Sequence, residues 1–400
     1  MAVSIAEHRS RVLALAAPRI LRGVPLDAAS GCVLATDVVG AYPVPPFDNS
    51  AMDGFVVHVA SLSGPGPWTL PVAGDIPAGV PAAPCPPGHA VRIMTGAPLP
   101  AGEGLTVIPV EDTDIPPGPV PLPDCVTITR WDPARTHIRP AGANLAAGSV
   151  VAAAGTLIDA GTLAALVSTG VTAVDAFAPP RVAVVSTGDE LVAWPTAPGP
   201  GQLPDSNLPM IAALARANGA GDVVELRTDD NNASFADVLD AAAQDADIVV
   251  TTGGISEGAY DVVRATTEPG GLVWFGRVHQ RPGAHQGAGC WRDTALVCLP
   301  GNPVAAWVSF HLYVAPLIAT AAGITDDPLR VTARAGAGFR PPRRAVPQIV
   351  PVRYSGGVAT PFSAGAHISA DVSALTAVRG YTILDGPDVP DILDVYLTHS

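Results

Sequence analysis

The stretch Asp247-Ile-Val-Val-Thr-Thr-Gly-Gly-Ile-Ser-Glu-Gly-Ala-Tyr-Asp261 decides the fold of this chain. A buried strand begins at Asp247 and runs into a glycine-bearing loop at 251–258, and a helical pattern starts near Tyr260. Paired glycines let the backbone approach a ligand closely, and a helix start offers unpaired N–H groups to an anion. Because Asp261 adds a carboxylate just past this place, the stretch favours a phosphorylated ligand that also needs a metal ion.

The surrounding sequence alternates between strands and helices. The predicted strands cover 182–187, 223–227, 248–252, 272–278 and 295–299, and the predicted helices cover 205–219, 233–246, 260–267 and 303–322. Such alternation predicts an α/β domain with a mostly parallel sheet covered on both faces. Ligands of these folds bind at the carboxyl ends of the strands.

Composition excludes several classes of protein. The net charge of −14 disfavours nucleic-acid binding, and the absence of lysine rules out a Walker A loop. The five cysteines form no CxxC pair and no HExxH occurs, so we expect neither a zinc site nor a disulfide framework. Every apolar run is interrupted before the length of a membrane span, and the N-terminus lacks a signal-peptide layout. We therefore expect a cytoplasmic protein without a membrane partner.

Three strand ends carry unusual loops, at 186–190, 251–258 and 299–304, and we expect all three to point into one cleft. The acidic candidates near them are Glu190, Asp205, Asp230 and Asp261. An Asp before a helix is often only a cap, and this reading is strongest for Asp205. The basic candidates, Arg277 and Arg281, would point to the same face if both lie on one strand.

A serine hydrolase is an alternative, because residues 254–258 match the GxSxG nucleophile elbow. Ser256 would be the nucleophile, and a downstream histidine would be its base, from among His279, His285, His311, His367 and His399. Against this reading, residues 251–253 separate the strand from the motif, and no HGGG-type oxyanion loop lies upstream.

Further motifs connect these loops to a known family. They are Pro46-Phe-Asp-Asn-Ser-Ala-Met-Asp-Gly54, Ile93-Met-Thr-Gly-Ala-Pro-Leu-Pro-Ala-Gly102 with Val110-Glu111, Ser186-Thr-Gly-Asp-Glu-Leu191, Asp205-Ser-Asn207, the loop 251–258 and Leu299-Pro-Gly-Asn-Pro303. In this order, over about residues 5–395, they resemble the motifs of the molybdopterin molybdenumtransferase family, which includes the E domain of gephyrin.

The resemblance implies a fold of four domains. These would be a linking domain (1–40 with 141–175), an inserted β domain (41–140), a doubly wound α/β molybdopterin-binding domain (176–325) and a C-terminal β-barrel (326–400). It also implies a homodimer whose active site lies between the α/β domain of one subunit and the inserted domain of the other. Asp53 would join the site in this way.

The activity implied by the resemblance is molybdenum insertion. Such an enzyme takes adenylylated molybdopterin and molybdate, releases AMP and inserts molybdenum into the dithiolene. Mg²⁺ would be held by Glu190, Asp230 and Asp261, with Asp53 as a further catalytic carboxylate. The cofactor-binding residues would be Thr252, Gly253, Gly254, Ser256, Asp205, Arg277, Arg281, Pro300, Gly301, Asn302 and Pro303. Molybdopterin adenylyltransferase and molybdoenzyme apoproteins would be partners.

Three positions depart from the family pattern. Asn144 stands where the family has an acid, Ala284 where it has a lysine, and Ala305 where it has a serine. His285 replaces the missing cation only when protonated, which is partial at neutral pH for an ordinary histidine. A molybdopterin-binding scaffold or carrier with weakened catalysis is therefore a second hypothesis.

Overall fold

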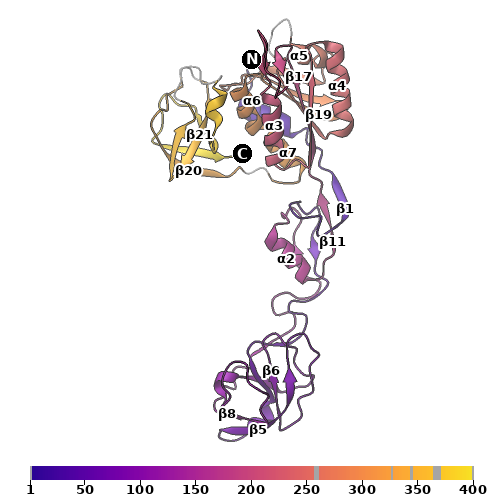
Figure 1. Cartoon of the computed structure of the whole chain (residues 1–400), viewed down its shortest axis with the longest axis vertical. Helices are drawn as coiled ribbons and strands as arrows, with labels where there is room; N and C mark the ends of the chain where they lie inside the picture. Colours follow the sequence, from indigo (N-terminus) through magenta and orange to yellow (C-terminus); the bar gives the residue numbers. More distant parts are fainter. Residues whose placement is uncertain (1, 256–260, 326–327, 343–345, 364–370, 399–400) are drawn as a thin grey trace. The chain divides into compact units, whose positions relative to one another are not determined.

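The structure is a computed structural model of the chain and describes residues 2–255, 261–325, 328–342, 346–363 and 371–398. Two compact units make up the chain (Figure 1). Unit 1 comprises Met1–Val24, Gly31–Ala35 and Asp175–Ser400, and unit 2 comprises Pro25–Ser30 and Thr36–Val174. The predicted boundaries at 40, 140, 175 and 325 stay a prediction.

A six-stranded sheet forms the centre of unit 1. Its order is β15 (Asp222–Thr228), β12 (Arg181–Thr187), β16 (Ile248–Thr252), β19 (Thr294–Leu299), β18 (His285–Trp291) and β17 (Val273–Arg277). The first four strands run parallel, whereas β18 is antiparallel to both of its neighbours. The predicted, mostly parallel sheet is therefore confirmed.

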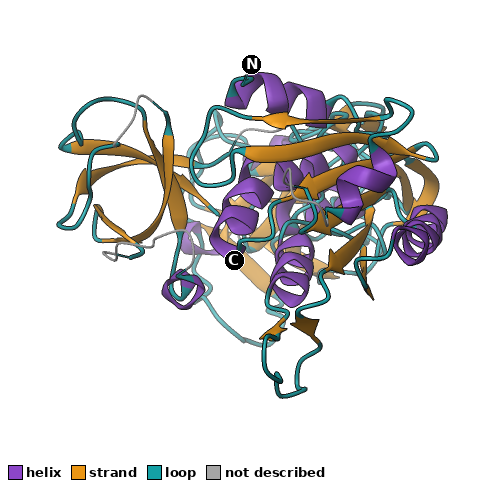
Figure 2. Ribbon diagram, turned by 90° about the horizontal axis from the view of Figure 1, so that it is seen from above, coloured by secondary structure: helices purple, strands orange, loops and turns teal. Residues whose placement is uncertain are grey.

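Helices cover both faces of this sheet (Figure 2). One face carries α3 (Asn207–Ala217), α6 (Pro303–Ser309), η3 (Phe310–Val314) and α7 (Ala315–Ala321), and the other carries α4 (Asn232–Asp245) and α5 (Val262–Thr267). Strand β12 shows why helices lie on both faces. Its residues Val182 and Val184 pack against the first group of helices, and Ala183 and Val185 pack against the second. A strand that is apolar on both faces needs helices on both sides.

Two sequence expectations need correction here. Strand β18 was not predicted, because its glycine-rich stretch has neither apolar alternation nor a β-branched run. The statement that no apolar run reaches the length of a membrane span is wrong for Pro303–Ala321, which has 19 residues and a mean hydropathy of 1.6. This segment is 83% buried inside the protein and packs as the central helix of unit 1. Its middle turn, η3, is a π-helix.

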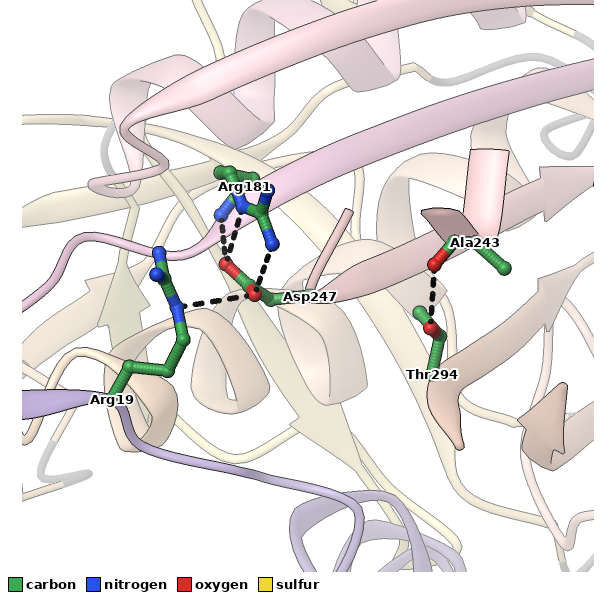
Figure 3. A network of polar contacts seen from close by, with 5 residues as sticks. All are labelled: Arg19, Arg181, Ala243, Asp247 and Thr294. Carbon is green, nitrogen blue, oxygen red and sulfur yellow. Dashed lines mark hydrogen bonds and ion pairs between the residues drawn. The ribbon is translucent and has the colours of Figure 1, made fainter. Parts of the chain in front are cut away.

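The amino-terminal edge of the sheet is held by polar contacts (Figure 3). Asp247, just before β16, accepts hydrogen bonds from the backbone N–H and guanidinium of Arg181 at 2.8 and 3.0 Å, and forms an ion pair with Arg19. Burial raises the pKa of Asp247, but the hydrogen bonds from Arg181 and the charge of Arg19 outweigh it and hold this pKa below its usual range. The Thr294 hydroxyl donates to the Ala243 carbonyl at 3.0 Å and ties β19 to α4.

Two further parts complete unit 1. The predicted C-terminal barrel is confirmed as a closed barrel in the order β20 (Arg330–Ala335), β22 (Val358–Pro361), β21 (Gln348–Ser355), β23 (Gly380–Leu384) and β24 (Ile392–Leu397), with a 3-10 turn, η5 (Val372–Leu375). At the N-terminus, α1 (Ile5–Leu13) begins with a capping box between Ser4 and Glu7. Its residue Val12 joins the core of unit 1.

Unit 2 is built mainly of strands. A five-stranded sheet has the order β7 (Leu105–Pro109), β4 (Gly54–His58), β6 (Ala90–Ile93), β5 (Trp68–Ile76) and β8 (Cys125–Ile128). Strands β3 (Asn49–Ser50) and β9 (Ile138–Arg139) pair, as do β2 (Val38–Val39) and β10 (Val150–Ala152). The remaining elements are η1 (Val59–Leu62), η2 (Val110–Asp112) and α2 (Ala160–Ser168). Strands β1 (Ile20–Pro25) and β11 (Ala173–Phe177), where the chain passes between the units, also pair.

Candidate functional site

Five loops of unit 1 lie at the carboxyl edge of the six-stranded sheet. They follow β12, β15, β16, β17 and β19. The parallel register places Ser186 beside Thr252 and Thr252 beside Leu299, so the loops after these strands begin side by side. Strand β17 runs in the same direction as β19, because both are antiparallel to β18. The three motif loops therefore share one edge of the sheet, and the loop carrying Arg281 follows β17 at the same edge. That the three loops point into one cleft stays a prediction.

The loop after β16 is packed tightly against its neighbours. Gly253 and Gly254 have φ of +93° and +62°, which favours glycine. The Gly253 N–H donates to the Leu299 carbonyl at 3.1 Å, so this N–H is already used within the protein. The role of Gly253 is to let neighbouring backbone pack closely against the loop. A Cβ on Gly301 would lie 3.3 Å from the Gly253 Cα, which shows how close these two motif loops are.

Two neighbours of these glycines offer polar groups. The Thr252 side chain is almost fully buried, and its hydroxyl has no hydrogen-bond partner within the described parts of the chain. The Gly254 N–H donates to no backbone carbonyl among the same residues. Both groups fit the predicted contact with a ligand. Ser256 lies outside the described residues, so its predicted role as a ligand or as a nucleophile stays a prediction.

Replacing Gly253 with alanine tests this packing. A Cβ at this position would lie 2.9 Å from the Thr187 carbonyl oxygen and would sit on a left-handed backbone. We expect Gly253→Ala to lower the free energy of unfolding by roughly 2–4 kcal/mol, because the cost of positive φ at alanine and the cost of overpacking add. Gly270→Ala is the matched control, because Gly270 has φ of +102° but open space around it. Urea unfolding measures both, and equal losses would contradict the close contact.

Acidic side chains gather where β12 and β15 end. The Thr187 hydroxyl donates to Asp230 Oδ1 at 2.7 Å. The backbone N–H groups of Asp189 and Asp230 donate to each other's carboxylates, both at 3.2 Å. Glu190 folds back over Gly188, where a Cβ would lie 2.7 Å from its Oε2. The sequence argument missed Asp189 and Thr187, although both lie within the quoted motif 186–191.

Asp261, the third predicted metal ligand, is half-buried at the start of α5. This helix start lies beside Gly254, because the Arg264 N–H donates to the Gly254 carbonyl at 3.2 Å. No set of three or more His, Cys, Asp or Glu side chains is arranged as a metal cage within the described residues. Mg²⁺ often takes one or two carboxylates and completes its shell with water and phosphate oxygens. Carboxylates at adjacent strand ends therefore fit Mg²⁺ held jointly with a phosphorylated ligand.

Asp205 occupies a different environment from the other acids. Its side chain is 1% exposed and forms an ion pair with Arg227 at 2.8 Å. It also accepts from the Ser186 hydroxyl at 2.6 Å and from the Leu208 N–H at 3.1 Å. Asp205 thus ties β12, β15 and the start of α3 together, and direct contact with a ligand stays a prediction. Its motif neighbour Asn207 donates to the Gly301 carbonyl at 2.8 Å and holds the third motif loop.

Arg277 and Arg281 do not lie on one strand, so the condition for a shared face is not met. Strand β17 ends at Arg277, and the chain turns before β18 begins at His285. The two arginines therefore stand at the strand end and in the turn, and both are exposed. Arg277 Nη1 lies 3.1 Å from His285 Nε2. Since a guanidinium only donates, His285 Nε2 is the acceptor in this contact.

The loop after β19 starts the central helix. Asn302 is the N-cap of α6, and its Oδ1 accepts from the Ala305 N–H at 3.5 Å. Pro303 occupies the first turn, where it needs no N–H partner. Pro300 and Gly301 precede this cap, with Gly301 exposed and Pro300 partly buried. Their predicted contact with molybdate stays a prediction.

Asp53 lies in unit 2, at the start of β4. The N–H and hydroxyl of Thr95 donate to its Oδ1 at 2.6 and 2.7 Å. These hydrogen bonds lower the pKa of Asp53, so the exposed carboxylate is charged at neutral pH. Asn144, one of the departures, is an exposed residue of the same unit. Thr95, which fixes Asp53, belongs to the quoted motif 93–102 but was not singled out.

Comparisons with known proteins agree with these motifs. Residues 3–170 match the family described as MoeA N-terminal region (domain I and II), and residues 183–320 match a probable molybdopterin binding domain. The chain is 40% identical over 333 residues to molybdopterin molybdenumtransferase 2 of Mycobacterium tuberculosis, covering 81% of this chain and 78% of the relative. It is 35% identical over 321 residues to the molybdopterin molybdenumtransferase of a Nostoc species, covering 78% and 72%.

A solved structure supports the fold. The molybdopterin biosynthesis MoeA protein from Pyrococcus horikoshii matches with a TM-score of 0.81 at 24% identity, over 99% of both chains. At this identity the likeness speaks for the fold, whereas the relatives at 35–40% identity speak for common descent. The chain belongs to the molybdopterin molybdenumtransferase family.

Proposed function

We propose that this protein is a molybdopterin molybdenumtransferase of molybdenum cofactor biosynthesis. It releases AMP from adenylylated molybdopterin in a Mg²⁺-dependent step and inserts molybdenum from molybdate into the dithiolene. The observation that supports this most is the meeting of five loops at the carboxyl edge of one sheet, which brings acidic, basic and glycine-rich motifs together. Each group of residues at this edge suits one part of a highly anionic substrate.

The glycine loop and the arginines bind and orient the anions. The Thr252 hydroxyl and the Gly254 N–H are donors for a phosphate at the end of β16. Arg277 and Arg281 offer planar, always charged donor forks to oxyanions. Pro300, Gly301, Asn302 and Pro303 shape the pocket for molybdate beside them. Because charge-assisted hydrogen bonds are short and directional, these groups also orient the substrate.

The carboxylates at the ends of β12, β15 and β16 are the groups for the metal. Mg²⁺ would be held by carboxylates from among Glu190, Asp230 and Asp261, together with water and phosphate oxygens of the substrate. Asp230 is oriented by Thr187 and Asp189. When bound, Mg²⁺ offsets the charge of the pyrophosphate link. Asp53 is a further carboxylate that is charged at neutral pH, since Thr95 lowers its pKa.

The assembly and partners follow from the family pattern. The protein would form a homodimer in the cytoplasm, in which Asp53 of one subunit joins the carboxyl edge of the other. It would receive its substrate from molybdopterin adenylyltransferase and pass the finished cofactor to molybdoenzyme apoproteins. The exposed, oriented carboxylate of Asp53 supports such a role, because it has no other partner than Thr95 among the described residues.

The direct test uses purified protein with adenylylated molybdopterin, Mg²⁺ and molybdate. We expect AMP release together with molybdenum insertion, both lost when EDTA removes the metal. Tight binding without turnover would instead support the carrier hypothesis. That alternative rests on three departures, which remove an acid at Asn144, a cation at Ala284 and a hydroxyl at Ala305. A Ser256-dependent hydrolysis of simple esters, abolished by Ser256→Ala, would support the hydrolase reading.

A further inference from the structure

Four buried polar side chains lie beneath the loop that carries Arg281. Gln280 and Gln286 are each 1% exposed, and Ser309 and Tyr313 are fully buried. They come from the loop itself, from β18, from α6 and from the π-helix η3. We call these four residues the loop-support cluster. Burying polar groups is costly unless they are hydrogen-bonded, so their partners indicate what they do.

The cluster holds two consecutive carbonyl groups of the loop. Tyr313 donates its hydroxyl proton to Gln280 Oε1, and Gln280 Nε2 donates to the Pro282 carbonyl at 3.1 Å. Gln286 Nε2 donates to the Gly283 carbonyl at 2.7 Å and to Ser309 Oγ at 2.7 Å. Burial raises the pKa of Tyr313 far above its usual range, which keeps this hydroxyl a donor.

Gly283 sits in the middle of this arrangement. Its φ is +76°, and an added Cβ would lie 3.0 Å from Ser309 Oγ and 3.3 Å from both Gln280 Nε2 and Gln286 Nε2. Three members of the cluster therefore surround one glycine. The turn at 282–283 is fixed from inside the protein by side chains that reach it from three elements.

The backbone of Arg281 is held from a second side. Its N–H donates to the Pro347 carbonyl at 2.9 Å, and its carbonyl accepts from the Ile349 N–H at 2.8 Å. Both partners belong to the edge of the C-terminal barrel at β21. Because both backbone groups of Arg281 are hydrogen-bonded, only its exposed side chain is free to change position.

These contacts have an electrostatic consequence. Carbonyl oxygens carry negative partial charge and repel an oxyanion. The two glutamine amides draw the carbonyls of Pro282 and Gly283 inward, so an anion on the exposed side meets the guanidinium rather than these oxygens. The same central helix begins at the loop 300–303 and supplies Ser309 and Tyr313, and it thus links both predicted oxyanion loops.

We propose that Gln280, Gln286, Ser309 and Tyr313 are positioning residues that set the Arg281 turn for the substrate oxyanion. The proposal rests on the proposed function, in which Arg281 binds that oxyanion. Apolar side chains would fill this space without the cost of burying four polar groups. A purely structural role therefore does not explain why these four residues are polar.

Tyr313→Phe is the first test, because it removes one hydroxyl and leaves the ring. We expect KM for molybdate to rise roughly five- to tenfold, the worth of one buried hydrogen bond, while kcat stays within about twofold. Tyr396→Phe, the same change within the barrel, is the matched control and should leave KM as in the wild type. A lower melting temperature with unchanged KM would overturn the proposal.

A double-mutant cycle with Arg281→Ala separates positioning from packing. If Tyr313 acts through Arg281, the rise in KM caused by Tyr313→Phe disappears in the Arg281→Ala background. Independent, additive effects would overturn the proposal. Unchanged KM in Arg281→Ala alone would instead refute the proposed function of Arg281, so the two failures are distinguishable. Should Tyr313→Phe not fold, Gln286→Met is put through the same cycle with the same two outcomes.

Discussion

Asp230→Asn is expected to lower Mg²⁺-dependent AMP release by roughly 100-fold or more, the several kcal/mol of charge stabilisation that a metal supplies. The exchange replaces a charged ligand by a neutral one of the same shape. The Thr187 hydroxyl, which donates to Asp230 Oδ1 at 2.7 Å, can still donate to the amide oxygen. The Asp189 N–H, which donates to Asp230 Oδ2 at 3.2 Å, then faces the amide NH2 and loses its acceptor. The loss of activity reports on the metal if the variant keeps the wild-type free energy of unfolding. Initial rates at increasing Mg²⁺ concentration measure it.

The control for this change is Asp237→Asn, at an exposed position of α4 in the same unit. It removes the same charge away from the carboxyl edge and should leave the rate within about twofold, as an ordinary surface substitution does. Near-normal turnover in Asp230→Asn would refute the metal role. Asp261→Ala should likewise abolish AMP release while the proposed dimer stays intact.

Mixing variants tests whether Asp53 acts across subunits. In a twofold-symmetric dimer, randomly mixed Asp53→Asn and Asp230→Asn subunits should recover about a quarter of the wild-type rate, since half of the dimers then carry one intact site. No recovery after subunit exchange would count against a site shared between subunits. Pull-down through an affinity tag carried by only one of the two variants confirms that the mixed dimers form.

Replacing His8 is expected to remove a large acid sensitivity of folding. His8 lies fully buried in α1, with ring centroids 4.5 Å from Tyr313 and 5.2 Å from Trp274. Neither ring nitrogen has a hydrogen-bond partner among the residues that the structure describes. Burial, with the charge of Arg11 as a smaller cause, lowers the pKa of His8 to about 3. The folded protein therefore keeps this ring neutral at mildly acidic pH.

The sign of the pH effect follows from the two states. An unfolded chain binds a proton at an ordinary histidine near pH 6.5, whereas the folded protein does not until about pH 3. The contribution of His8 to the free energy of unfolding is thus fully present above pH 6.5. It is lost as the pH falls, by about 1.4 kcal/mol per pH unit. The whole contribution amounts to roughly 3–5 kcal/mol by pH 3.

Urea unfolding of the wild type and of His8→Phe at pH 7.5 and 4.5 checks this prediction. The drop in unfolding free energy between the two pH values should be smaller by about 2–3 kcal/mol in the variant, which has no ring nitrogen to protonate. His279→Gln is the control, because His279 is exposed and stays hydrated in both states. An equal drop in wild type and His8→Phe would show that His8 is not the acid-sensitive group.

Local patterns of the sequence were sufficient for much of the fold. The apolar runs at 182–187 and 248–252 predicted strands that are buried on both faces, and the structure confirms both. The glycine loop at 253–254 was placed correctly at a strand end, since positive φ and close approach both require glycine. By contrast, β18 was missed, because its glycines carry no periodic signal and its pairing partners lie elsewhere in the chain.

By itself, the sequence determined the α/β architecture and the identity of the acidic and basic motifs, because these depend on residue type and local period. The family and the C-terminal barrel followed from the resemblance of the ordered motifs. Only the tertiary structure decided how the motifs meet. It showed that Arg281 lies in the turn after the strand of Arg277, and that the Asp230 N–H donates to Asp189. It also showed that Tyr313 donates to Gln280, which in turn holds the Arg281 turn. Such contacts depend on strand register and on packing between distant segments, and a one-dimensional pattern reports which face a side chain takes but not what it meets there.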